Sequence, residues 1–560
     1  MVYTPDCQRR QTLPLKNKCK FQEVIMKKIS GVFYSGKNVK YLVFSYIFLS
    51  LLGGFVILSA NENIAALFNN HLMVLGAEGF YSALLLTVSL FAALFLLSLL
   101  SEYILHTILW RGEERLKGYF IRRLLRAKSA YFYDKQAPEL WSNINMSTQM
   151  AAGFFSTLLQ AVSTIIMLGF YGAIIFSIDI TAGILSLAAI PFYMLLTKGV
   201  GRNFESMQHG IMANHRELSV VAQEAITNAS NVKVKNAYDF FVKRVISVQS
   251  KITVGMRKFN VLQSYLNSVI ATVSIIAPII IIFTALQLSS TLVANIGVVL
   301  ILYINIPRFL ASFGSLYSHI IRYRSSKPAL ATLKELSAIE LEPEGGKVIN
   351  SFESLESSGV KVDYGNGRVI EVPDVVILRG EKVMFFGESG AGKSTLFNIV
   401  MGLNDKYEGI VRVNGIDIRE IELASLRNVF GIAFQGGQVL TLNLKDNMLI
   451  GREGLDFEVE KIMKISNLGD LSDSKAEETI YSQTVSGGEK SRIGLAQTLI
   501  GSPAVLLIDE TFSNVDEGME ELMLNNLMKE YPEKTILCIS HRTSSKRFFS
   551  RNVEFTGEAA

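Results

Sequence analysis

Long apolar stretches dominate the first half of the chain and are separated by short polar or charged segments. A helix that crosses a bilayer needs about 20 apolar residues. Asp179 divides one stretch that is too long for a single crossing, and the polar run 287–290 divides another. The pattern therefore predicts six membrane-spanning helices, at about 41–60, 80–101, 153–177, 180–197, 262–287 and 291–313.

Lys and Arg residues are unevenly distributed among the segments that connect these helices. Residues 1–40 and the long loops 102–150 and 198–258 are basic, whereas the short loops 61–79 and 287–291 contain neither Lys nor Arg. Because cytoplasmic loops are enriched in positive charge, both termini and both long loops are predicted to be cytoplasmic. The long loops have a helical composition and, folded as helical hairpins, would extend roughly 35 and 45 Å from the bilayer.

The character of the sequence changes after about residue 340. A stretch rich in Glu, Gly and Ser, 340–359, indicates a linker. Beyond it, short β-rich runs alternate with helical patterns, which indicates an α/β domain. We expect a basic cytoplasmic segment at 1–40, a transmembrane domain at 41–325, a linker at 326–350 and an α/β domain at 351–560.

The overall composition agrees with a membrane protein that carries a soluble domain. Hydrophobic residues make up 49% of the chain and charged residues 19%, below the roughly 25% charged share of soluble domains. A net charge of +5 does not argue for a nucleic-acid partner. Three cysteines cannot form a disulfide scaffold, and none lies in a C-x-x-C pair that would suggest zinc.

A glycine-rich motif, GESGAGKST, follows a strand-like run and opens an amphipathic helical run. This is the context of a phosphate-binding loop, in which backbone N–H groups at a helix N-terminus surround the phosphates. Lys393 would neutralise phosphate charge, and the Ser394 hydroxyl would bind Mg²⁺. The predicted nucleotide-binding residues of this loop are Gly387, Glu388, Ser389, Gly390, Ala391, Gly392, Lys393, Ser394 and Thr395.

Two buried strand-like runs end in ionisable residues. The first ends in Asp509 and Glu510, and the second ends in His541. At the carboxyl end of a parallel strand, Asp509 can reach Mg²⁺ and Glu510 can orient or deprotonate a water molecule. Taken alone, Asp-Glu could form a plain surface turn, and a lone histidine is more often structural. Ser486, Gly487 and Gly488 precede another helical pattern and form a second candidate anion site.

These motifs together strongly resemble those of ATP-binding cassette (ABC) transporters, specifically exporter-type half-transporters with a membrane domain fused ahead of the ATPase. The resemblance covers about residues 35–560. It implies a multidomain membrane protein, with a six-helix all-α transmembrane domain of the ABC exporter type and an α/β P-loop ATPase domain. It also implies ATP and Mg²⁺ as ligands. Because every consensus element is present in one chain, a homodimer is the simplest expectation, and a heterodimer remains open.

The resemblance assigns roles to individual residues. Glu510 matches the catalytic glutamate, Gln435 the Q-loop glutamine that contacts Mg²⁺, and His541 the switch histidine. Catalytic roles are thus expected for Glu510, His541, Lys393 and Gln435, and metal-binding roles for Ser394, Gln435 and Asp509. Further nucleotide contacts are expected from the signature loop, which consists of Ser486, Gly487 and Gly488, and from Asp516 in the D-loop. Tyr364 resembles the aromatic residue that stacks on adenine. An ordinary strand tyrosine is the alternative for Tyr364.

Other segments match the family or depart from it. The segments 130–144 and 225–234 resemble the two coupling helices that dock on the ATPase. The signature reads VSGGE instead of the commoner LSGGQ, and only 19 residues follow His541, so the usual C-terminal helices are expected to be short or absent. No peptidase-like domain precedes the first span, so leader-peptide cleavage is not expected, and Cys7 and Cys19 are interpreted as incidental thiols.

The resemblance predicts an ATP-driven translocase in the plasma membrane, with a bacterial cell membrane favoured. It would move an amphipathic peptide, lipid or drug out of the cytoplasm or inner leaflet by alternating access coupled to ATP hydrolysis. The alternatives are a lipid or lipid-linked carrier flippase, a non-transporting ATP-gated channel or regulator, and uptake through the same fold. The spans contain almost no ionisable groups. Candidate cavity residues are Tyr265, Asn267, Tyr303, Asn305 and Arg308, with helix packing as the competing role of the first four.

Overall fold

The computed structural model describes residues 27–69, 77–197, 204–288, 296–363, 369–388, 390–471 and 478–555. The chain divides into two compact units. A helical unit comprises Met1–Ala127 and Asp134–Glu340, and an α/β unit comprises Lys128–Tyr133 and Leu341–Ala560. A short piece of the first long loop, which includes the 3₁₀ turn η2 (Ser129–Phe132), therefore groups with the α/β unit.

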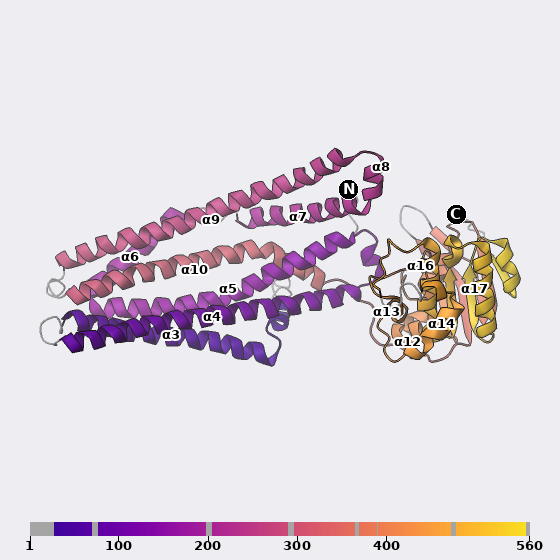
Figure 1. Ribbon diagram of the computed structural model, residues 1–560, viewed down its shortest axis with the longest axis horizontal. Helices are drawn as coiled ribbons and strands as arrows, with labels where there is room; N and C mark the ends of the chain where they lie inside the picture. Colours follow the sequence, from indigo (N-terminus) through magenta and orange to yellow (C-terminus); the bar gives the residue numbers. More distant parts are fainter. Residues whose placement is uncertain are drawn as a thin grey trace. The chain divides into compact units, whose positions relative to one another are not determined.

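The helical unit is built from a few very long helices (Figure 1). Its elements are α3 (Lys37–Asn69), α4 (Ala77–Leu125), α5 (Ala137–Ile178), α6 (Ile180–Thr197), α7 (Phe204–Thr227), α8 (Ala229–Val234), α9 (Tyr238–Leu288) and α10 (Ile296–Ser337). Within the described residues, α3, α4, α5, α9 and α10 are long and apolar enough to cross a membrane, and α6 is a shorter apolar helix. The protein is therefore a membrane protein, and the count of six passes stays a prediction.

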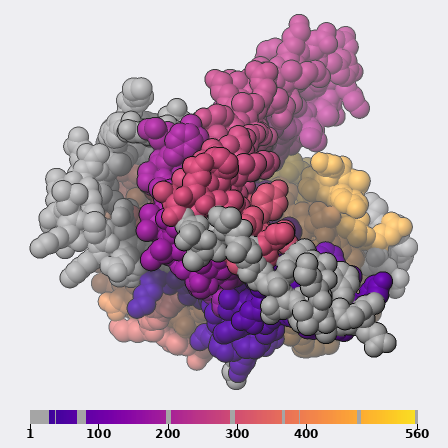
Figure 2. Space-filling model, turned by 90° about the vertical axis from the view of Figure 1, so that its left-hand side faces the viewer, coloured from indigo at the N-terminus to yellow at the C-terminus, as the bar shows by residue number. Residues whose placement is uncertain are grey.

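The long predicted loops are largely continuations of these helices. Helix α4 runs from the apolar stretch into the basic segment and ends at Leu125, and α5 begins with Pro138 in its first turn. Proline is tolerated there because the first amides of a helix have no intrahelical partner. Helices α7 and α9 pack side by side, and Figure 2 shows α9, coloured magenta to pink, extending away from α3 and α4 in indigo.

Close approach between helices depends on small residues. Helix α5 packs against α10, and α3 packs against both α4 and α5. A Cβ atom at Gly54 of α3 would lie 2.1 Å from the ring of Phe170 of α5, so glycine is required at this crossing. Helix α10 also contains Pro307 and Pro328 in its interior.

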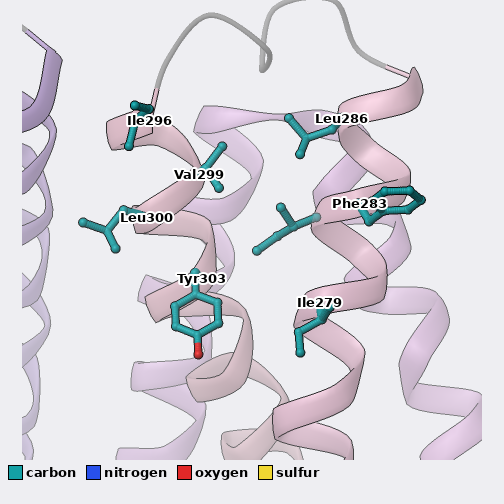
Figure 3. Close-up of a pocket in the computed structure, with 8 residues that line it drawn as sticks. Ile279, Phe283, Leu286, Ile296, Val299, Leu300 and Tyr303 are labelled. Atoms are coloured by element: carbon teal, nitrogen blue, oxygen red, sulfur yellow. The ribbon is translucent and has the colours of Figure 1, made fainter.

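A small apolar cavity lies between the C-terminal end of α9 and the N-terminal end of α10 (Figure 3). Its volume is about 380 Å³. The side chain of Tyr303 supplies a hydroxyl, and all other lining side chains are hydrocarbon. The lining residues are Ile279, Ile282, Phe283, Leu286, Ile296, Val299, Leu300 and Tyr303.

The α/β unit contains two sheets. A parallel sheet has the strand order β10-β4-β9-β8-β7, and an antiparallel sheet has the order β2-β1-β5-β6, with β3 also paired to β1. The strands are β1 (Ser354–Asp363), β2 (Val369–Val372), β3 (Val375–Leu378), β4 (Lys382–Gly387), β5 (Glu408–Val413), β6 (Ile416–Asp417), β7 (Phe430–Ala433), β8 (Val505–Asp509), β9 (Thr535–Ile539) and β10 (Arg551–Phe555). The helices are α11 (Lys393–Val400), α12 (Leu423–Val429), α13 (Leu444–Leu449), α14 (Val459–Ile465), α16 (Gly487–Leu499) and α17 (Glu517–Glu530).

Both faces of the parallel sheet are buried, which explains its continuous apolar strands. Side chains of successive residues point to opposite faces of a strand. In β8, Leu507 joins a core with Phe385 and Leu537, while Leu506 joins a second core with Ile536. The register pairs Leu507 with Leu537, so the polar carboxyl ends of neighbouring strands meet at one edge.

The segment expected to be a linker is more ordered than its composition indicates. Helix α10 continues to Ser337 and buries Ala329, Leu330, Leu333 and Leu336, so residues 326–337 are helical. Strand β1 covers 354–359, where Leu355 is fully buried and the Ser357 hydroxyl donates to the carbonyl of Pro373. Tertiary packing thus overrides the weak local preference of a Ser- and Gly-rich stretch.

Candidate nucleotide-binding and catalytic site

The glycine-rich loop joins β4 to α11, as the motif requires. Gly392 caps α11 in the left-handed region, at φ +93°, and a Cβ there would lie 2.7 Å from the Ile370 side chain. The ammonium group of Lys393 donates to the carbonyls of Gly387 and Glu388 at 2.8 and 2.7 Å. The loop therefore closes around its own lysine. Ser389 lies outside the described residues.

Lys393 is a buried cation next to two carboxylates. Only 4% of the surface of Lys393 is exposed to solvent. Burial lowers the pKa of Lys393, and the charges of Glu510 and Asp509 oppose that shift. A desolvated ammonium held by backbone carbonyls is well suited to exchange those neutral partners for phosphate oxygens, because the interaction with an anion is stronger.

Ser394 and Asp509 form an oxygen-rich pair at the end of β8. The Ser394 hydroxyl donates to Asp509 Oδ1 at 2.8 Å. Burial raises the pKa of Asp509, and the hydrogen bond from Ser394 opposes this effect. A hydroxyl and a carboxylate are hard oxygen ligands of the kind that Mg²⁺ prefers, so the residues present fit a magnesium site.

Glu510 is held by two side chains from other segments. Gln435 Nε2 donates to Glu510 Oε2, and His541 Nε2 lies against Glu510 Oε1, both at 2.9 Å. Glu510 adopts left-handed backbone angles, φ 45° and ψ 26°, and its amide donates to the carbonyl of Ile539 on β9. A non-glycine residue in this region is uncommon, and such strain is concentrated at functional sites.

The loop that carries Gln435 packs directly on helix α16. Gly437 has φ +62°, and a Cβ there would lie 2.0 Å from the carbonyl oxygen of Lys490. On the same helix, Gln497 donates to the carbonyl of Gln438 at 2.9 Å. This contact ties the glutamine beside Glu510 to the helix that begins with the signature loop. Sequence reasoning did not identify Gly437, although the consecutive glycines 436–437 were visible.

The signature loop forms a well-capped helix N-terminus. The Ser486 hydroxyl accepts from the amide of Glu489, and the Glu489 carboxylate accepts from the amide of Ser486, which makes a capping box. Gly487 lies against Asn514, so that a Cβ at Gly487 would be 3.1 Å from Asn514 Cβ. Among the described residues, the Ser486 side chain bonds to Glu489 and not to the phosphate-binding loop.

The D-loop is connected to the histidine segment by a buried ion pair. Asp516 caps α17 by accepting from the amide of Met519 at 2.9 Å. One turn later, Glu520 accepts from Arg542 at 2.6 Å and from the Ser545 hydroxyl at 2.5 Å. Sequence reasoning missed Arg542 and Glu520. The adjacency of Arg542 to His541 was a usable signal, but the pairing with Glu520 depends on the tertiary fold.

The predicted site residues thus fall into two groups. The phosphate-binding loop, Asp509, Glu510, Gln435 and His541 converge at the carboxyl edge of the parallel sheet. The signature residues and Asp516 lie at the N-termini of α16 and α17. Tyr364 lies outside the described residues.

The candidate cavity residues of the helical unit have separate environments. The Tyr265 hydroxyl donates to the carbonyl of Leu196 at 3.1 Å, and Asn267 accepts from Gln263 on the same helix. Tyr303 lines the cavity of Figure 3. Asn305 and Arg308 lie on α10 and face other helices, as described below.

Family models match both parts of the chain. The model described as ABC transporter transmembrane region matches residues 28–309, and the model described as ABC transporter matches residues 373–513. These two ranges contain the apolar helices and most of the motifs of the sheet edge.

Individual relatives are distant in sequence. The lactococcin-A transport/processing ATP-binding protein LcnC of Lactococcus lactis subsp. lactis is 25% identical over 481 residues, which cover 81% of this chain and 64% of the relative. The heterocyst differentiation ATP-binding protein HepA of a Nostoc species is 23% identical over 451 residues, 77% of this chain and 72% of the relative. The chain thus spans about 64% of the length of LcnC.

A solved structure matches almost the whole chain. A bacterial Atm1-family ABC exporter with ATP bound aligns with a TM-score of 0.76 and 20% sequence identity, covering 92% of this chain and 93% of that chain. At this identity the likeness shows the fold, which is that of an ABC exporter. Both family models and this fold lead to the same conclusion: the chain belongs to the ABC transporter family, with a transmembrane region followed by an ATP-binding cassette domain.

Proposed function

We propose that the chain is one half of an ATP-driven exporter that moves an amphipathic substrate out of the cytoplasm or inner leaflet. The observation that carries this proposal is the convergence of Lys393, Asp509, Glu510 and His541 at one sheet edge, in a chain that also carries an exporter-type membrane domain. Phosphate binding, water activation and membrane helices are thereby joined in one polypeptide.

ATP would bind against the glycine-rich loop. Backbone amides at the start of α11 and the Lys393 ammonium would hold its phosphates. Ser394, Asp509 and Gln435 would hold Mg²⁺, which would supply positive charge against the negative charge of the phosphates. The adenine contact of Tyr364 remains a prediction from resemblance.

Glu510 would orient the attacking water and accept its proton. Both of its carboxylate oxygens contact a neighbouring side chain, Gln435 or His541, in the present arrangement. We infer that these two neighbours turn toward the nucleotide when it binds and release Glu510 for the water. The fixed backbone of Glu510 at the end of β8 keeps its carboxylate at the sheet edge during this exchange, which favours catalysis by positioning.

A second copy of the chain would complete each nucleotide pocket. The N-terminus of α16 presents amide donors and the positive end of a helix dipole, both suited to an anion. Among the described residues of one chain, Ser486 bonds to Glu489 and not to the phosphate-binding loop. Two copies arranged head to tail would place Ser486 of one against ATP held by the other. A heterodimer with a related chain is the alternative.

Coupling to the membrane would proceed through the long loops. Residues 128–133 group with the α/β unit, where Lys128 forms an ion pair with Asp405 at 2.6 Å. This supports a coupling role for the first loop, and α8 is the corresponding candidate in the second. Six passes and cytoplasmic termini complete this proposal.

The proposed substrate class is inferred from the residues that line the apolar cavity and from the descriptions of similar proteins. The apolar cavity between α9 and α10 suits hydrocarbon groups. Since LcnC is described as a lactococcin-A transport and processing protein, a hydrophobic peptide is a natural candidate, with a lipid or lipid-linked carrier as the second. A gated channel would not need a water-activating carboxylate held by Gln435 and His541, so these contacts favour turnover.

The test is reconstitution of the full chain in proteoliposomes. We expect magnesium-dependent ATP hydrolysis, a dimer that is trapped by ATP in the Glu510→Gln variant, and ATP-dependent transport of a labelled hydrophobic peptide away from the ATPase side. A protein that stays monomeric in this variant with ATP and Mg²⁺ would refute the shared-pocket proposal. Ion conductance without hydrolysis would favour the channel alternative.

A further inference from the structure

Arg308 is a cation in the interior of a predicted membrane span. It lies 12 residues after Ile296, the first described residue of α10, which corresponds to about 18 Å along the helix. Arg308 also lies five residues, or about 8 Å along the helix, before the end of the predicted span 291–313, so it is inside the span and nearer to its C-terminal end. Ionisable side chains within a membrane span are costly and commonly belong to a functional site.

The Arg308 guanidinium has a neutral neighbour. It lies close to the Tyr171 hydroxyl on α5, and it forms no ion pair with a described carboxylate. Glu62 on α3 is exposed, and Asp179 accepts from the amide of Ala182 at 2.7 Å. Because a guanidinium has five N–H donors, one hydroxyl leaves several available to an anion.

A buried polar atom without a partner lies three residues before Arg308, close to one helical turn away. Asn305 is completely buried and donates to Asn61 Oδ1 at 2.7 Å and to the carbonyl of Ile301 at 2.8 Å. Its own Oδ1 has no hydrogen-bond partner. This level of the helical unit therefore holds a buried polar atom that packing does not satisfy, which is unusual for a purely structural layer.

The walls around these groups are apolar. Ile306 and Phe309 flank Arg308 on α10 and pack in one core with Ile175 of α5. A cation next to an apolar core matches a ligand that has one anionic group and an apolar body. The planar guanidinium can donate two parallel hydrogen bonds to a carboxylate or a phosphate.

We propose that Arg308, with Tyr171, binds the anionic group of the transported substrate, a carboxylate or a phosphate on an otherwise apolar molecule. This inference rests on the proposed function and narrows its substrate class to amphipathic anions, such as a hydrophobic peptide with a free C-terminus or a lipid phosphate. The competing interpretation is that Arg308 only joins α5 to α10 through Tyr171.

The test uses the full chain in phosphatidylcholine nanodiscs and three probes with the same alkyl chain. N-dodecanoylglycine carries a carboxylate, its methylamide is neutral, and dodecyl phosphate carries a phosphate. Binding is measured without nucleotide, from the rise in apparent melting temperature with probe concentration. The half-maximal concentration for stimulation of ATP hydrolysis is a second readout.

We expect the wild type to bind at least one of the two anions about 10-fold more tightly than the methylamide, and Arg308→Gln to abolish that preference. Arg308→Lys keeps the positive charge and should keep part of the preference for anions. This variant therefore tests the proposal even if Arg308→Gln does not fold. Tyr171→Phe should weaken anion binding a few-fold. Arg324→Gln, an exposed arginine farther along α10, is the matched control and should keep both the preference and the basal ATPase activity.

The relative affinity for the two anionic probes identifies which class of molecule supplies the anionic group. Preference for the carboxylate indicates a peptide or acyl amino acid, and preference for the phosphate indicates a lipid headgroup. Equal binding of all three probes by the wild type, or an unchanged preference in Arg308→Gln, overturns the proposal. Anion preference in a protein that does not hydrolyse ATP would instead contradict the proposed function and leave the binding site in place.

Discussion

Arg542 is joined to Glu520 by a hydrogen-bonded ion pair of 2.6 Å, in which the glutamate is 1% exposed. A second nitrogen of the same guanidinium donates to the carbonyl of Val515 at 2.6 Å. The residue after His541 is therefore fixed both to α17 and to the segment just before it, at Val515. Its guanidinium bonds to Glu520 and Val515 and to no described residue of the phosphate-binding loop, so we interpret Arg542 as a positioning residue.

Replacing Arg542 by Met should remove this connection and leave a buried carboxylate without a counter-ion. Loss of one partner of a buried pair costs on the order of 3 kcal/mol, which corresponds to a fall of about 5–10 °C in apparent melting temperature. We expect kcat for ATP hydrolysis to fall about 10-fold, with KM for ATP changed less than about 3-fold, because the nucleotide contacts are intact.

The double variant Glu520→Gln with Arg542→Met provides the control. With Gln at position 520 the buried side chain is neutral, so part of the stability that the Arg542→Met variant loses should return. Arg542→Lys should be intermediate, because lysine keeps the charge but cannot donate to both partners in the same geometry. If the single and double variants melt at the same temperature, the ion pair does not stabilise this region.

Glu510→Gln should retain ATP binding and lose turnover. Glutamine keeps the size and the contacts to Gln435 and His541 but cannot accept a proton from water, so we expect kcat to fall at least about 100-fold. Nucleotide affinity is measured with a fluorescent ATP analogue and hydrolysis by phosphate release. Near wild-type hydrolysis would remove Glu510 from the mechanism.

Gly437→Ala tests the contact between the Q-loop and α16. The added Cβ would lie 2.0 Å from a backbone oxygen, so the loop must move and carry Gln435 with it. Gly415→Ala is the matched control, because Gly415 also has a positive φ, of +76°, but a Cβ there meets nothing within 4 Å.

Both alanine variants share a backbone cost of about 1–2 kcal/mol. Only Gly437→Ala should also lower the rate of ATP hydrolysis, by about 10-fold or more if Gln435 leaves its place beside Glu510. Equal loss of activity in the two variants would show that the steric contact has no special role.

Lys534 makes stability depend on pH. Burial lowers its pKa to about 8, while its ammonium donates to Ser502 Oγ and to the carbonyl of Pro503. In the unfolded chain the same group stays protonated to about pH 10.4. Unfolding therefore takes up a proton between these values, and raising the pH through this window favours the folded state.

We expect the apparent melting temperature of the wild type to rise relative to Lys534→Met between pH 7 and 9.5. The comparison with the variant removes contributions from other titrating groups. A difference that is constant over this range would mean that the lysine keeps its ordinary pKa in the folded protein.

The sequence predicted the features that depend on local pattern. The lengths of the apolar stretches located the membrane helices. The phosphate-binding loop could be identified because its glycines, lysine and serine lie in one short segment. The contacts of Glu510 were less accessible, since Gln435 and His541 are distant in the chain and meet only because β7, β8 and β9 are neighbours.

The features that sequence reasoning missed depend on tertiary packing. Glu520 resembles an ordinary polar position of an amphipathic helix, and only the fold buries it against Arg542. Arg308 was visible as a charge in a span, but its lack of a carboxylate partner follows from which helices surround it. The continuation of α10 to Ser337 was also missed, because residues 326–350 were expected to form a linker and only the fold buries Leu333 and Leu336.

Pro307 gives α10 a weak point beside Arg308. Proline has no amide hydrogen, so the carbonyl of Tyr303, four residues earlier, has no partner within the helix. The helix is therefore easier to bend at the level of Arg308. Ser337 lies 29 residues farther along α10, which is about 44 Å, so a small change of tilt beside Arg308 would move the C-terminal end of the helix by a larger distance.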